Sequence, residues 1–301
     1  MKAKVILNPY SNRWRAKKRW PEAAAALKAA GVDFSLAVSE QHGQAVQLAS
    51  EAAREGYSPI IAAGGDGTIG EVVNGLARAY GEEHLGTLGI MPLGTANDLV
   101  CNLGLPLDLE KAAKVIAAGK TLPLDVCKAN DRYFVNNSAI GLEPYVTTIQ
   151  QEIKWLKGIP RYLVAALKGI FHHPTWQARV EWDDGEYEGP LSLISVGNAP
   201  RTGGLFYMAP HADPFDGKLT AVLAYKKSAL STLLVLPKAM SPEGTFVQSE
   251  GIREIHATYI RICLERPSPA HCDGELFAEE VKELTYGILP GRLNVLCDKN
   301  L

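Results

Sequence analysis

Two glycine-rich segments of this sequence have the residue types that bind phosphate groups. The first, GGDGT at 64–68, follows an apolar run, and the second, PLGTAND at 92–98, follows another. Glycine lets the backbone approach a phosphate oxygen, and the start of a helix presents free N–H groups with partial positive charge. Both segments therefore indicate phosphate binding where a strand gives way to a helix.

Each segment also contains an aspartate, Asp66 in the first and Asp98 in the second. A carboxylate in such a loop repels a bare pyrophosphate, so the pattern favours a divalent cation, Mg²⁺, between the two. A literal GxGxxG, at Gly65, Gly67 and Gly70, also leaves an NAD-dependent oxidoreductase open. Against it, the loop follows the third predicted strand rather than the first, and it contains Asp66.

The elements that must position these loops alternate between strand and helix over residues 1–125. Strands are predicted at 4–7, 33–38, 59–63 and 88–91, and helices at 20–30, 43–55, 69–80 and 109–118. This alternation predicts an α/β domain with a parallel sheet and crossover helices. In such a sheet, ligands gather outside the carboxyl ends of the strands, where both glycine loops and the polar turn 8–12 lie.

The second part of the chain has a different pattern. Short β-rich runs separated by turn signals lie at 133–136, 177–182, 191–198, 218–224, 257–264 and 292–296. They predict a mainly-β sandwich domain over residues 126–301, interrupted by helices at 160–171 and 228–239. We expect the last strand to pack back toward the N-terminal domain.

Composition argues against several classes of protein. The 301 residues are 47% apolar and 21% charged, with a formal net charge of −2, whereas nucleic-acid binding needs a concentrated basic surface. Five cysteines without CxxC spacing predict reduced thiols rather than disulfides or a zinc site. The sequence has no signal-peptide pattern and no apolar run near the roughly 18 residues of a spanning helix. We therefore expect a cytoplasmic protein without a transmembrane segment, which contacts membranes peripherally.

The combination of motifs resembles the diacylglycerol kinase catalytic family, which includes bacterial lipid kinases and sphingosine and ceramide kinases. The motifs are GGDGT followed by Glu71 and Asn74, then PLGTANDL, then HCDGE at 271–275. The resemblance implies an ATP-binding domain similar to those of NAD kinases and phosphofructokinases, a β-sandwich lipid domain, and a site in the cleft between them. It implies transfer of the γ-phosphate of ATP to a hydroxyl of diacylglycerol or a related lipid, with Mg²⁺, and leaves a homodimer as an expectation.

The family's functional positions map onto this sequence one by one. The ATP contacts fall on Asn8, Pro9, Tyr10, Ser11, Asn12, Ser39, Gly65, Asp66, Gly67, Thr68, Ile69, Gly70, Glu71 and Thr95. The acidic set that holds the catalytic Mg²⁺ falls on Asp66, Asp98 and Asp125. A structural Mg²⁺ would be held by the Asp216 carboxylate and by carbonyls of Asp213 and Lys218. Two departures are Asn12, where glycine is usual after the serine, and Ser39, where threonine is common.

The resemblance also identifies Asp273 and Glu275 as the catalytic carboxylates. Either could accept the proton of the lipid hydroxyl, and we favour Glu275, with Asp273 as the residue that orients it. Taken alone, Asp273-Gly274 would be an ordinary hairpin turn, and only the two glycine loops give it significance. We expect the neighbouring His271 to be a surface or packing residue.

A stretch without acidic residues, 153–180, suggests where a lipid surface docks. It contains four aromatic residues and the basic residues Lys154, Lys157, Arg161, Lys168 and Arg179. Such a pattern suits an anionic membrane, although amphipathic helices covering the sandwich core explain it equally well. A kinase of the NAD kinase type, with a soluble acceptor, shares the GGDGT loop and stays open, as does a nucleotide-binding regulator without turnover. The sequence does not single out the lipid acceptor; diacylglycerol is our expectation.

Overall fold

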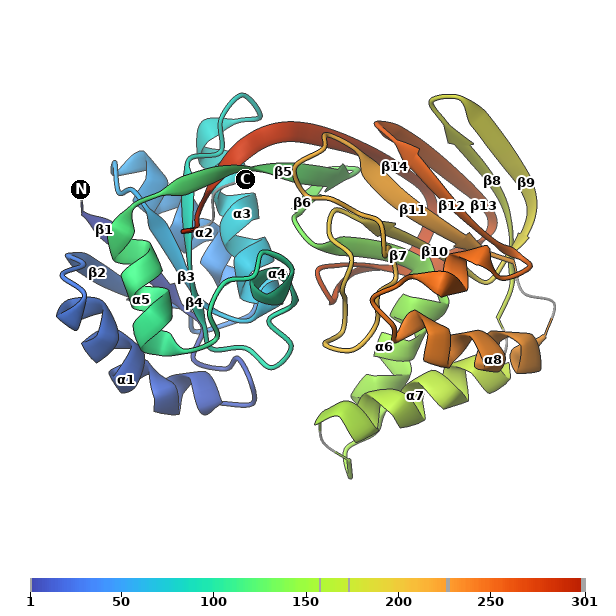
Figure 1. Ribbon diagram of the computed structural model, residues 1–301, viewed down its shortest axis with the longest axis horizontal. Helices are drawn as coiled ribbons and strands as arrows, with labels where there is room; N and C mark the ends of the chain where they lie inside the picture. The colour runs from blue at the N-terminus through green and yellow to red at the C-terminus, as the bar shows by residue number, and fades with distance from the viewer. Residues whose placement is uncertain (1, 157, 173, 226–227, 299–301) are drawn as a thin grey trace. The chain divides into compact units, whose positions relative to one another are not determined.

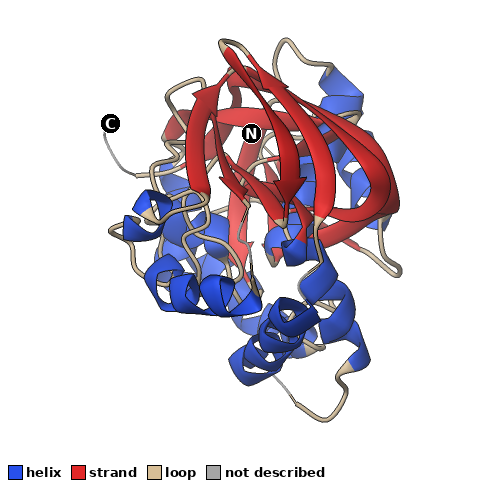
Figure 2. Ribbon diagram, turned by 90° about the vertical axis from the view of Figure 1, so that its right-hand side faces the viewer, coloured by secondary structure: helices blue, strands red, loops and turns tan. Residues whose placement is uncertain are grey.

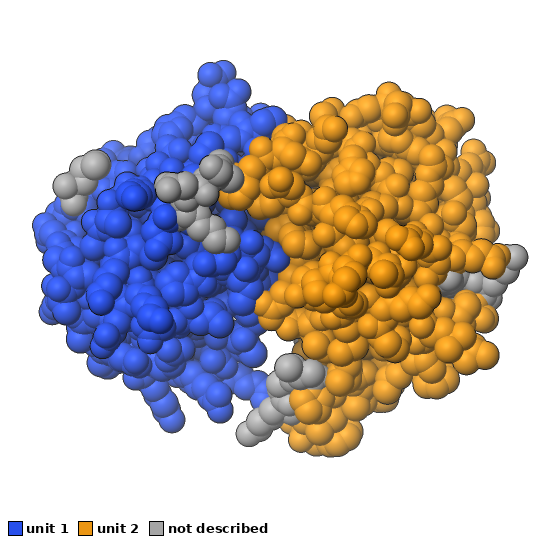
Figure 3. Space-filling model, viewed as in Figure 1, with its two compact units in different colours: residues 1–126, 133–135, 289–301 blue, residues 127–132, 136–288 orange. Residues whose placement is uncertain are grey.

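A computed structural model describes residues 2–156, 158–172, 174–225 and 228–298; Lys157 of the basic stretch lies outside these residues. The chain forms two compact units, coloured separately in Figure 3. Unit 1 comprises Met1–Val126, Tyr133–Val135 and Leu289–Leu301, and unit 2 comprises Cys127–Arg132 and Asn136–Ile288. Unit 1 thus includes two segments that follow residue 125.

The sheet of unit 1 is parallel. Its strands are β1 (Ala3–Leu7), β2 (Phe34–Val38), β3 (Ile60–Gly64) and β4 (Thr87–Pro92), in the order β4-β3-β1-β2. The end of β14 (Glu275–Leu296) adds a further parallel strand, because Asn294 and Val295 pair with Thr87 and Leu88. The inner strands β1, β3 and β4 are apolar on both faces, as expected where helices cover both sides of a parallel sheet.

The helices of unit 1 are α1 (Arg15–Ala29), α2 (Gln44–Arg54), α3 (Asp66–Tyr80), α4 (Asp98–Asn102) and α5 (Leu109–Ala118). Helices α1 and α5 share a buried cluster with Val5, Leu7 and Ile61 of the sheet. Helices α2 and α3 pack against each other and against β1 and β3, and Figure 1 shows α3 and α5 on opposite sides of the strands. Every strand and helix predicted over residues 1–125 is present, with the largest shift at α1, which begins at Arg15 rather than Trp20.

Unit 2 is mainly antiparallel β-structure. Its strands include β7 (Asn137–Gly141), β8 (Trp176–Trp182), β9 (Gly185–Leu191), β10 (Leu193–Gly197), β11 (Leu219–Ala224), β12 (Ile252–Ala257) and β13 (Tyr259–Cys272). They run in the order β12-β11-β10-β7-β13-β14, with β8 and β9 extending from β13. Figure 2 draws all strands of the chain in red and all helices in blue. Strands β5 (Thr121–Ala129) and β6 (Arg132–Phe134) each contain residues of both units.

Strand β13 changes one of its neighbours along its length. Its first part pairs with β8, Ile260 opposite Trp182, and its end pairs with β7, Cys272 opposite Ser138. The register shifts between Cys263 and Ser268, in the segment that contains Pro267. Because proline has no N–H to donate, the ladder is interrupted there, and the neighbour of β13 changes from β8 to β7 across this irregularity. The predicted fold class, an α/β domain followed by a mainly-β sandwich, is confirmed.

The helices of unit 2 are α6 (Leu142–Glu152), α7 (Gly158–His172), α8 (Ala229–Ala239) and the short 3₁₀ helix η1 (Thr245–Gln248). The predicted helices 160–171 and 228–239 correspond to α7 and α8. Helix α6 was not predicted, although Pro144 in its first turn is a start signal. Helices α6 and α7 pack together around Val146, Ile149 and Ala165. Within the described residues, no helix combines the length and the hydrophobicity needed to cross a bilayer.

Gly75 of α3 lies where α2 approaches most closely. A Cβ atom at this position would lie 2.4 Å from the Val46 carbonyl oxygen and 2.7 Å from the Ala49 Cβ. Both helices are anchored in the core, so we expect Gly75→Ala to lower the free energy of unfolding by about 1–3 kcal/mol, measured by urea denaturation. Gly287→Ala is the control, because its Cβ would meet no atom within 4 Å, and it should change stability by less than about 0.5 kcal/mol. Equal stabilities of the two variants would contradict this close packing.

Candidate active site

The polar turn that follows β1 is bonded to the glycine loop that follows β3. The Asn8 Nδ2 donates to Thr68 Oγ1 at 3.2 Å, and Ser11 Oγ lies 3.2 Å from the same oxygen. The backbone N–H of Asn8 donates to the Ala63 carbonyl at 3.0 Å. Thr68 therefore joins two segments in which ATP contacts were predicted.

The two glycine loops touch through their backbones. A Cβ on Gly94 would lie 2.4 Å from the Gly65 Cα and 2.6 Å from the Asn97 Oδ1. The Leu93 N–H donates to the Gly64 carbonyl at 2.9 Å, which holds the loops together. Any larger residue at Gly94 would push the loops apart, so this contact requires glycine.

Asn12 bridges the polar turn and the second glycine loop. Its Nδ2 donates to the Gly94 carbonyl at 3.3 Å, and its Oδ1 accepts from Thr95 Oγ1 at 3.1 Å. Its φ angle of 51° lies in the left-handed region, where glycine is favoured and asparagine is the best tolerated alternative. The departure from the family's usual glycine therefore keeps the backbone conformation available.

The start of α3 presents amides at the first glycine loop. The first intrahelical bond runs from the Ile69 N–H to the Gly65 carbonyl at 3.0 Å, so the preceding amides are those that a phosphate would meet. The Asp66 Oδ1 accepts from the Leu99 N–H at 3.1 Å and so ties α3 to the first turn of α4.

The three predicted ligands of the catalytic Mg²⁺ lie at different depths. Asp66 is half-buried, Asp98 is 4% exposed, and Asp125 is 2% exposed and accepts from the Gly291 N–H at 2.6 Å. Within the described part of the chain, these three carboxylates do not form a group whose ligand atoms all lie within 4.8 Å of one another. Their oxygens are the hard ligands that Mg²⁺ prefers, and coordination partly through water fits this spacing better than direct coordination by all three.

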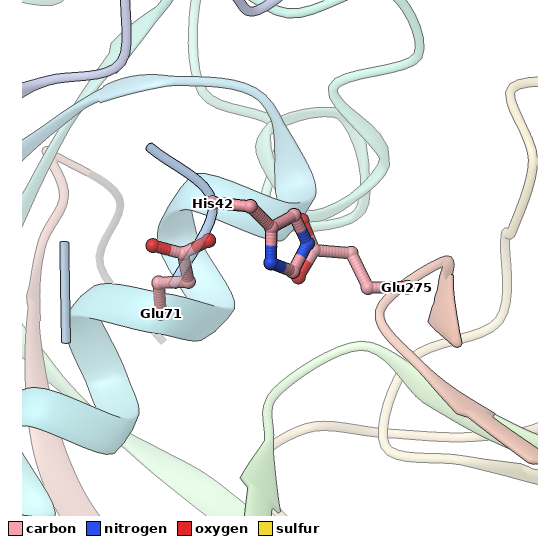
Figure 4. A group of neighbouring side chains, drawn as sticks. All are labelled: His42, Glu71 and Glu275. Carbon is pink, nitrogen blue, oxygen red and sulfur yellow. The ribbon is translucent and has the colours of Figure 1, made fainter. Parts of the chain in front are cut away.

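Both carboxylate oxygens of Glu71 hold the start of α2. They accept from the N–H groups of Gly43 and Ala45, each at 3.0 Å, and the residue is 3% exposed. A negative charge at a helix N-terminus is stabilising. Figure 4 shows Glu71 on α3 beside His42 of the loop before α2; Glu275 in the same picture belongs to unit 2. The ATP contact expected of Glu71 stays a prediction.

Unit 1 has a surface hollow of about 440 Å³ beside the polar turn. Its lining includes Pro9, Tyr10 and Ser39, which are predicted ATP contacts, together with Trp14 and Val38. The rings of Tyr10 and Trp14 meet edge to face, with their centroids 4.4 Å apart. A volume of this size lies within the range of small-molecule sites.

In unit 2, Asp273 and Gly274 form the tight turn between β13 and β14. Both have positive φ angles, 48° and 79°, and Cys272 pairs with Glu275 across a two-residue loop. The Asp273 Oδ1 accepts from the N–H groups of Asn136 and Asn137 at 2.9 and 3.1 Å, and Asp273 is 7% exposed. This carboxylate is therefore buried and held in place by backbone.

Glu275 is more accessible than Asp273, with 22% of its side chain exposed. Its Oε2 lies 3.4 Å from Nη2 of Arg132, and the Arg132 Nε is buried without a hydrogen-bond partner among the described residues. Arg132 was not predicted, because no sequence motif surrounds it and only the folded chain brings it beside Glu275, 143 positions later.

The predicted structural Mg²⁺ site is an exposed turn of unit 2. The Asp213 Oδ1 accepts from the Phe215 N–H at 3.1 Å, and the Asp216 Oδ1 accepts from the Lys218 N–H at 2.8 Å. Gly217 has a φ angle of 72°, which completes the turn. The predicted donors are all oxygen atoms, which suits Mg²⁺. Binding of Mg²⁺ by this turn stays a prediction.

His271 is a buried residue of β13, 2% exposed, rather than a surface residue. Its Nε2 lies 3.0 Å from Oε1 of Glu143, which is 8% exposed. Burial disfavours the charged form of Glu143, but the His271 imidazole and hydrogen bonds from Asn137 and Ser195 outweigh burial and lower the pKa of this carboxyl below its ordinary value.

The comparisons with known proteins agree with this arrangement. Residues 2–129 match the diacylglycerol kinase catalytic domain, and residues 137–297 match the YegS C-terminal NAD kinase beta sandwich-like domain. The chain is 34% identical to a diacylglycerol kinase of Staphylococcus aureus (strain MRSA252) over 231 residues, which cover 75% of this chain and 71% of that protein. It is 29% identical to a diacylglycerol kinase of Bacillus subtilis (strain 168) over 292 residues, 96% and 92% of the two chains.

A solved structure of a diacylglycerol kinase from Bacillus anthracis str. Sterne superposes with a TM-score of 0.77 at 25% identity, covering 99% of this chain and 97% of the other. Fold and matches together define the class: the protein is a lipid kinase, an enzyme that transfers a phosphoryl group. Within that class, the chain belongs to the diacylglycerol kinase family. Membership of this family favours a lipid kinase over the oxidoreductase and NAD kinase alternatives.

The lowered pKa of Glu143 makes the stability of unit 2 sensitive to acid. A carboxyl whose pKa is lower in the folded state stabilises the protein above its unfolded pKa, which is near 4.5, and this contribution is lost as pH falls through the folded pKa. We expect the melting temperature to fall below about pH 4.5, and to fall less steeply in Glu143→Gln. Thermal unfolding between about pH 3 and pH 6 measures this. If the melting temperature fell equally steeply with decreasing pH in both proteins, the assignment of this pH dependence to Glu143 would be contradicted.

Proposed function

We propose that the protein transfers the γ-phosphate of ATP to the hydroxyl of diacylglycerol or a closely related membrane lipid, with Mg²⁺. The observation that carries the proposal is the backbone contact between Gly65 and Gly94, by which the two glycine loops, the predicted phosphate-binding segments, adjoin at the carboxyl ends of β3 and β4. Two adjoining loops suit a polyphosphate better than a single phosphate group. The printed names of the relatives favour diacylglycerol as the acceptor.

The nucleotide is proposed to bind along unit 1. The polar turn adjoins the surface hollow through Tyr10 and the first glycine loop through Asn8 and Ser11. This geometry supports placing the base and ribose in the hollow, beside Tyr10 and Ser39, and the phosphates at the amides that begin α3. The loops then hold the phosphates without rearrangement, which is the main catalytic task in phosphoryl transfer.

The acidic residues would hold the metal. Asp66 and Asp98 lie at the starts of the two helices that follow the glycine loops, and Asp125 would contribute through water. When bound, Mg²⁺ would neutralise charge that develops on the phosphate oxygens. Asp216, with carbonyls of Asp213 and Lys218, would hold a second ion that stiffens the turn.

Glu275 is the better candidate for the general base. The Asp273 carboxylate is buried and accepts two backbone hydrogen bonds, which suits a residue that orients rather than one that exchanges protons. Glu275 is more exposed and is positioned from one side by Arg132. It would accept the proton of the lipid hydroxyl as the hydroxyl oxygen bonds to the γ-phosphorus and the bond to the β-phosphate breaks, releasing ADP.

A lipid-panel assay with γ-labelled ATP tests the proposed reaction. Label should enter the organic phase with diacylglycerol, and the activity should disappear with a chelator. Glu275→Gln should lower kcat by about 10²–10⁴-fold with little change in KM for ATP, because it removes the base but no nucleotide contact. Asp66→Asn and Asp98→Asn should lower both activity and Mg²⁺ affinity.

The control for this assay is Glu280→Gln, an exposed carboxylate on the same strand β14, which should behave as wild type. Label that stays in the aqueous phase, on a soluble acceptor, would instead point to a kinase of the NAD kinase type.

Peripheral membrane contact is proposed for the helical face of unit 2. Large apolar side chains are exposed on or before α7 and on α8: Trp155 is 76% exposed, Phe171 71%, Leu230 66% and Leu234 68%. Exposed lysines accompany them at positions 154, 168 and 238. Apolar side chains beside cations suit an anionic bilayer. Arg161 is a weaker contributor than expected, because its Nε donates to the Gln150 carbonyl of α6 at 2.6 Å. A homodimer stays a prediction from the family resemblance.

The triple variant Trp155→Ser, Phe171→Ser, Leu234→Ser tests the membrane face. A buried large apolar side chain contributes about 1.5–3 kcal/mol, so even partial insertion of three predicts at least about a tenfold loss of binding to phosphatidylglycerol-containing vesicles. Vesicle co-sedimentation measures it. Leu107→Ser, at a leucine of unit 1 that is 50% exposed, is the matched control. Unchanged binding of the triple variant would exclude this face.

A further inference from the structure

Unit 2 contains a buried carboxylate–imidazole pair that no step of the proposed mechanism uses. It consists of Glu143 in the first turn of α6 and His271 near the end of β13, 3.0 Å apart and 8% and 2% exposed. Burying charged or polar groups is costly, and apolar residues of similar volume often stabilise a core as well. The position of this pair therefore calls for an explanation other than stability.

The Glu143 carboxylate receives hydrogen bonds from three other elements. Its Oε1 also accepts from the Asn137 Nδ2 of β7 at 3.1 Å, and its Oε2 accepts from the Ser195 hydroxyl of β10 at 3.4 Å. The His271 Nδ1 is buried and has no hydrogen-bond partner in the described part of the chain. The orientation of the imidazole therefore depends on Glu143.

Two of these contacts lead to the Asp273–Gly274 turn. His271 lies two residues before Asp273 on the same strand. Asn137 binds Asp273 directly: its N–H donates to the Asp273 Oδ1 at 3.1 Å, and its carbonyl accepts from the Asp273 N–H at 2.7 Å. The Asn137 side chain is in turn held by Glu143 on one side and by the Thr202 hydroxyl, at 2.9 Å, on the other.

We infer that Glu143 is a positioning residue for the hairpin that holds Asp273 and Glu275. It contacts neither of them, but it holds Asn137 of the neighbouring strand β7 and His271 of β13, the strand that leads into the turn. These two residues fix the position of the turn. The inference rests on the proposed function in so far as these two carboxylates are catalytic. Supporting groups of this kind matter because a misplacement of about 1 Å at the reacting group can cost about a hundredfold in rate.

The test uses the full chain with three isosteric or nearly isosteric substitutions. Glu143→Gln removes the charge that holds His271, and Thr202→Val removes the other hydrogen bond to the Asn137 side chain. Thr220→Val is the matched control: Thr220 is 1% exposed in β11 of the same unit, and its hydroxyl bonds to His256 at 3.0 Å, away from the Asn137 contacts. Each variant is compared by melting temperature, by kcat and KM, and by hydrogen exchange of the amides of Asn136, Asn137 and Asp273.

Glu143→Gln should lower kcat by about 10–100-fold, leave KM for ATP unchanged, and speed the exchange of these amides. Thr202→Val should change the same quantities in the same direction by a smaller factor. It also provides the test if Glu143→Gln does not fold. Thr220→Val should lose comparable stability while its kcat and these exchange rates stay at the wild-type values.

Equal losses of kcat in Glu143→Gln and Thr220→Val would show that only stability is involved and would overturn the inference. So would unchanged exchange at Asp273 in both Glu143→Gln and Thr202→Val. Failure of the proposed function gives a different result: the wild-type protein would phosphorylate no lipid. Faster exchange in the two variants would then still support the positioning of the turn.

Discussion

The organisation of unit 1 depends on the close approach of two backbones. Gly65 and Gly94 lie so near each other that a Cβ on Gly94 would clash with the Gly65 backbone, and a Cβ on Gly65 would be crowded against Gly94. This approach brings the starts of α3 and α4 together, and it is secured from a third side by Asn12 and Thr68. The amides at both helix starts then carry partial positive charge in one region, which Asp66 partly offsets by accepting from the Leu99 N–H. The positively charged surroundings of an anionic ligand would therefore be formed before the ligand binds.

In unit 2, backbone amides hold a buried carboxylate: Asp273 is fixed by the N–H groups of Asn136 and Asn137. Further inside lie two buried titratable groups, the Cys272 thiol, whose pKa burial raises to about 12, and the Tyr286 hydroxyl, whose pKa burial also raises. Both therefore stay protonated at physiological pH and serve as hydrogen-bonding groups around Ser138.

Local signals in the sequence account for what could be predicted. Helix α5 has the predicted bounds because Asp108 caps its start and Gly119, with a φ angle of 67°, ends it. Helix α1 begins at Arg15 rather than at the predicted Trp20 and continues through Pro21; Ala16 in its first turn is fully buried, a tertiary effect that local sequence signals do not show. The glycine loops were found because their chemistry is contiguous in sequence.

Arg132 and Glu143 were missed for the opposite reason. Arg132 meets Glu275 across 143 positions, and Glu143 lies 128 positions before its partner His271, so nothing local marks either residue. The change of neighbour along β13, from β8 to β7, was likewise not predictable, because it arises from pairing between distant strands. Motif spacing reveals groups that a ligand touches, whereas the groups that hold them emerge only when distant strands are paired.

The path of strand β14 determines when the sheet of unit 1 can be completed during synthesis. It begins at Glu275 in unit 2 and ends beside β4 in unit 1, where Leu293 and Val295 are fully buried. The parallel sheet of unit 1 therefore lacks a neighbour for β4 until residues 293–296 have left the ribosome. During synthesis, the two glycine loops are translated early, when the sheet that carries them is still incomplete, and an unpaired edge of this kind is a site of misassembly. Completion of the unit 1 sheet therefore requires residues that are translated after all of unit 2.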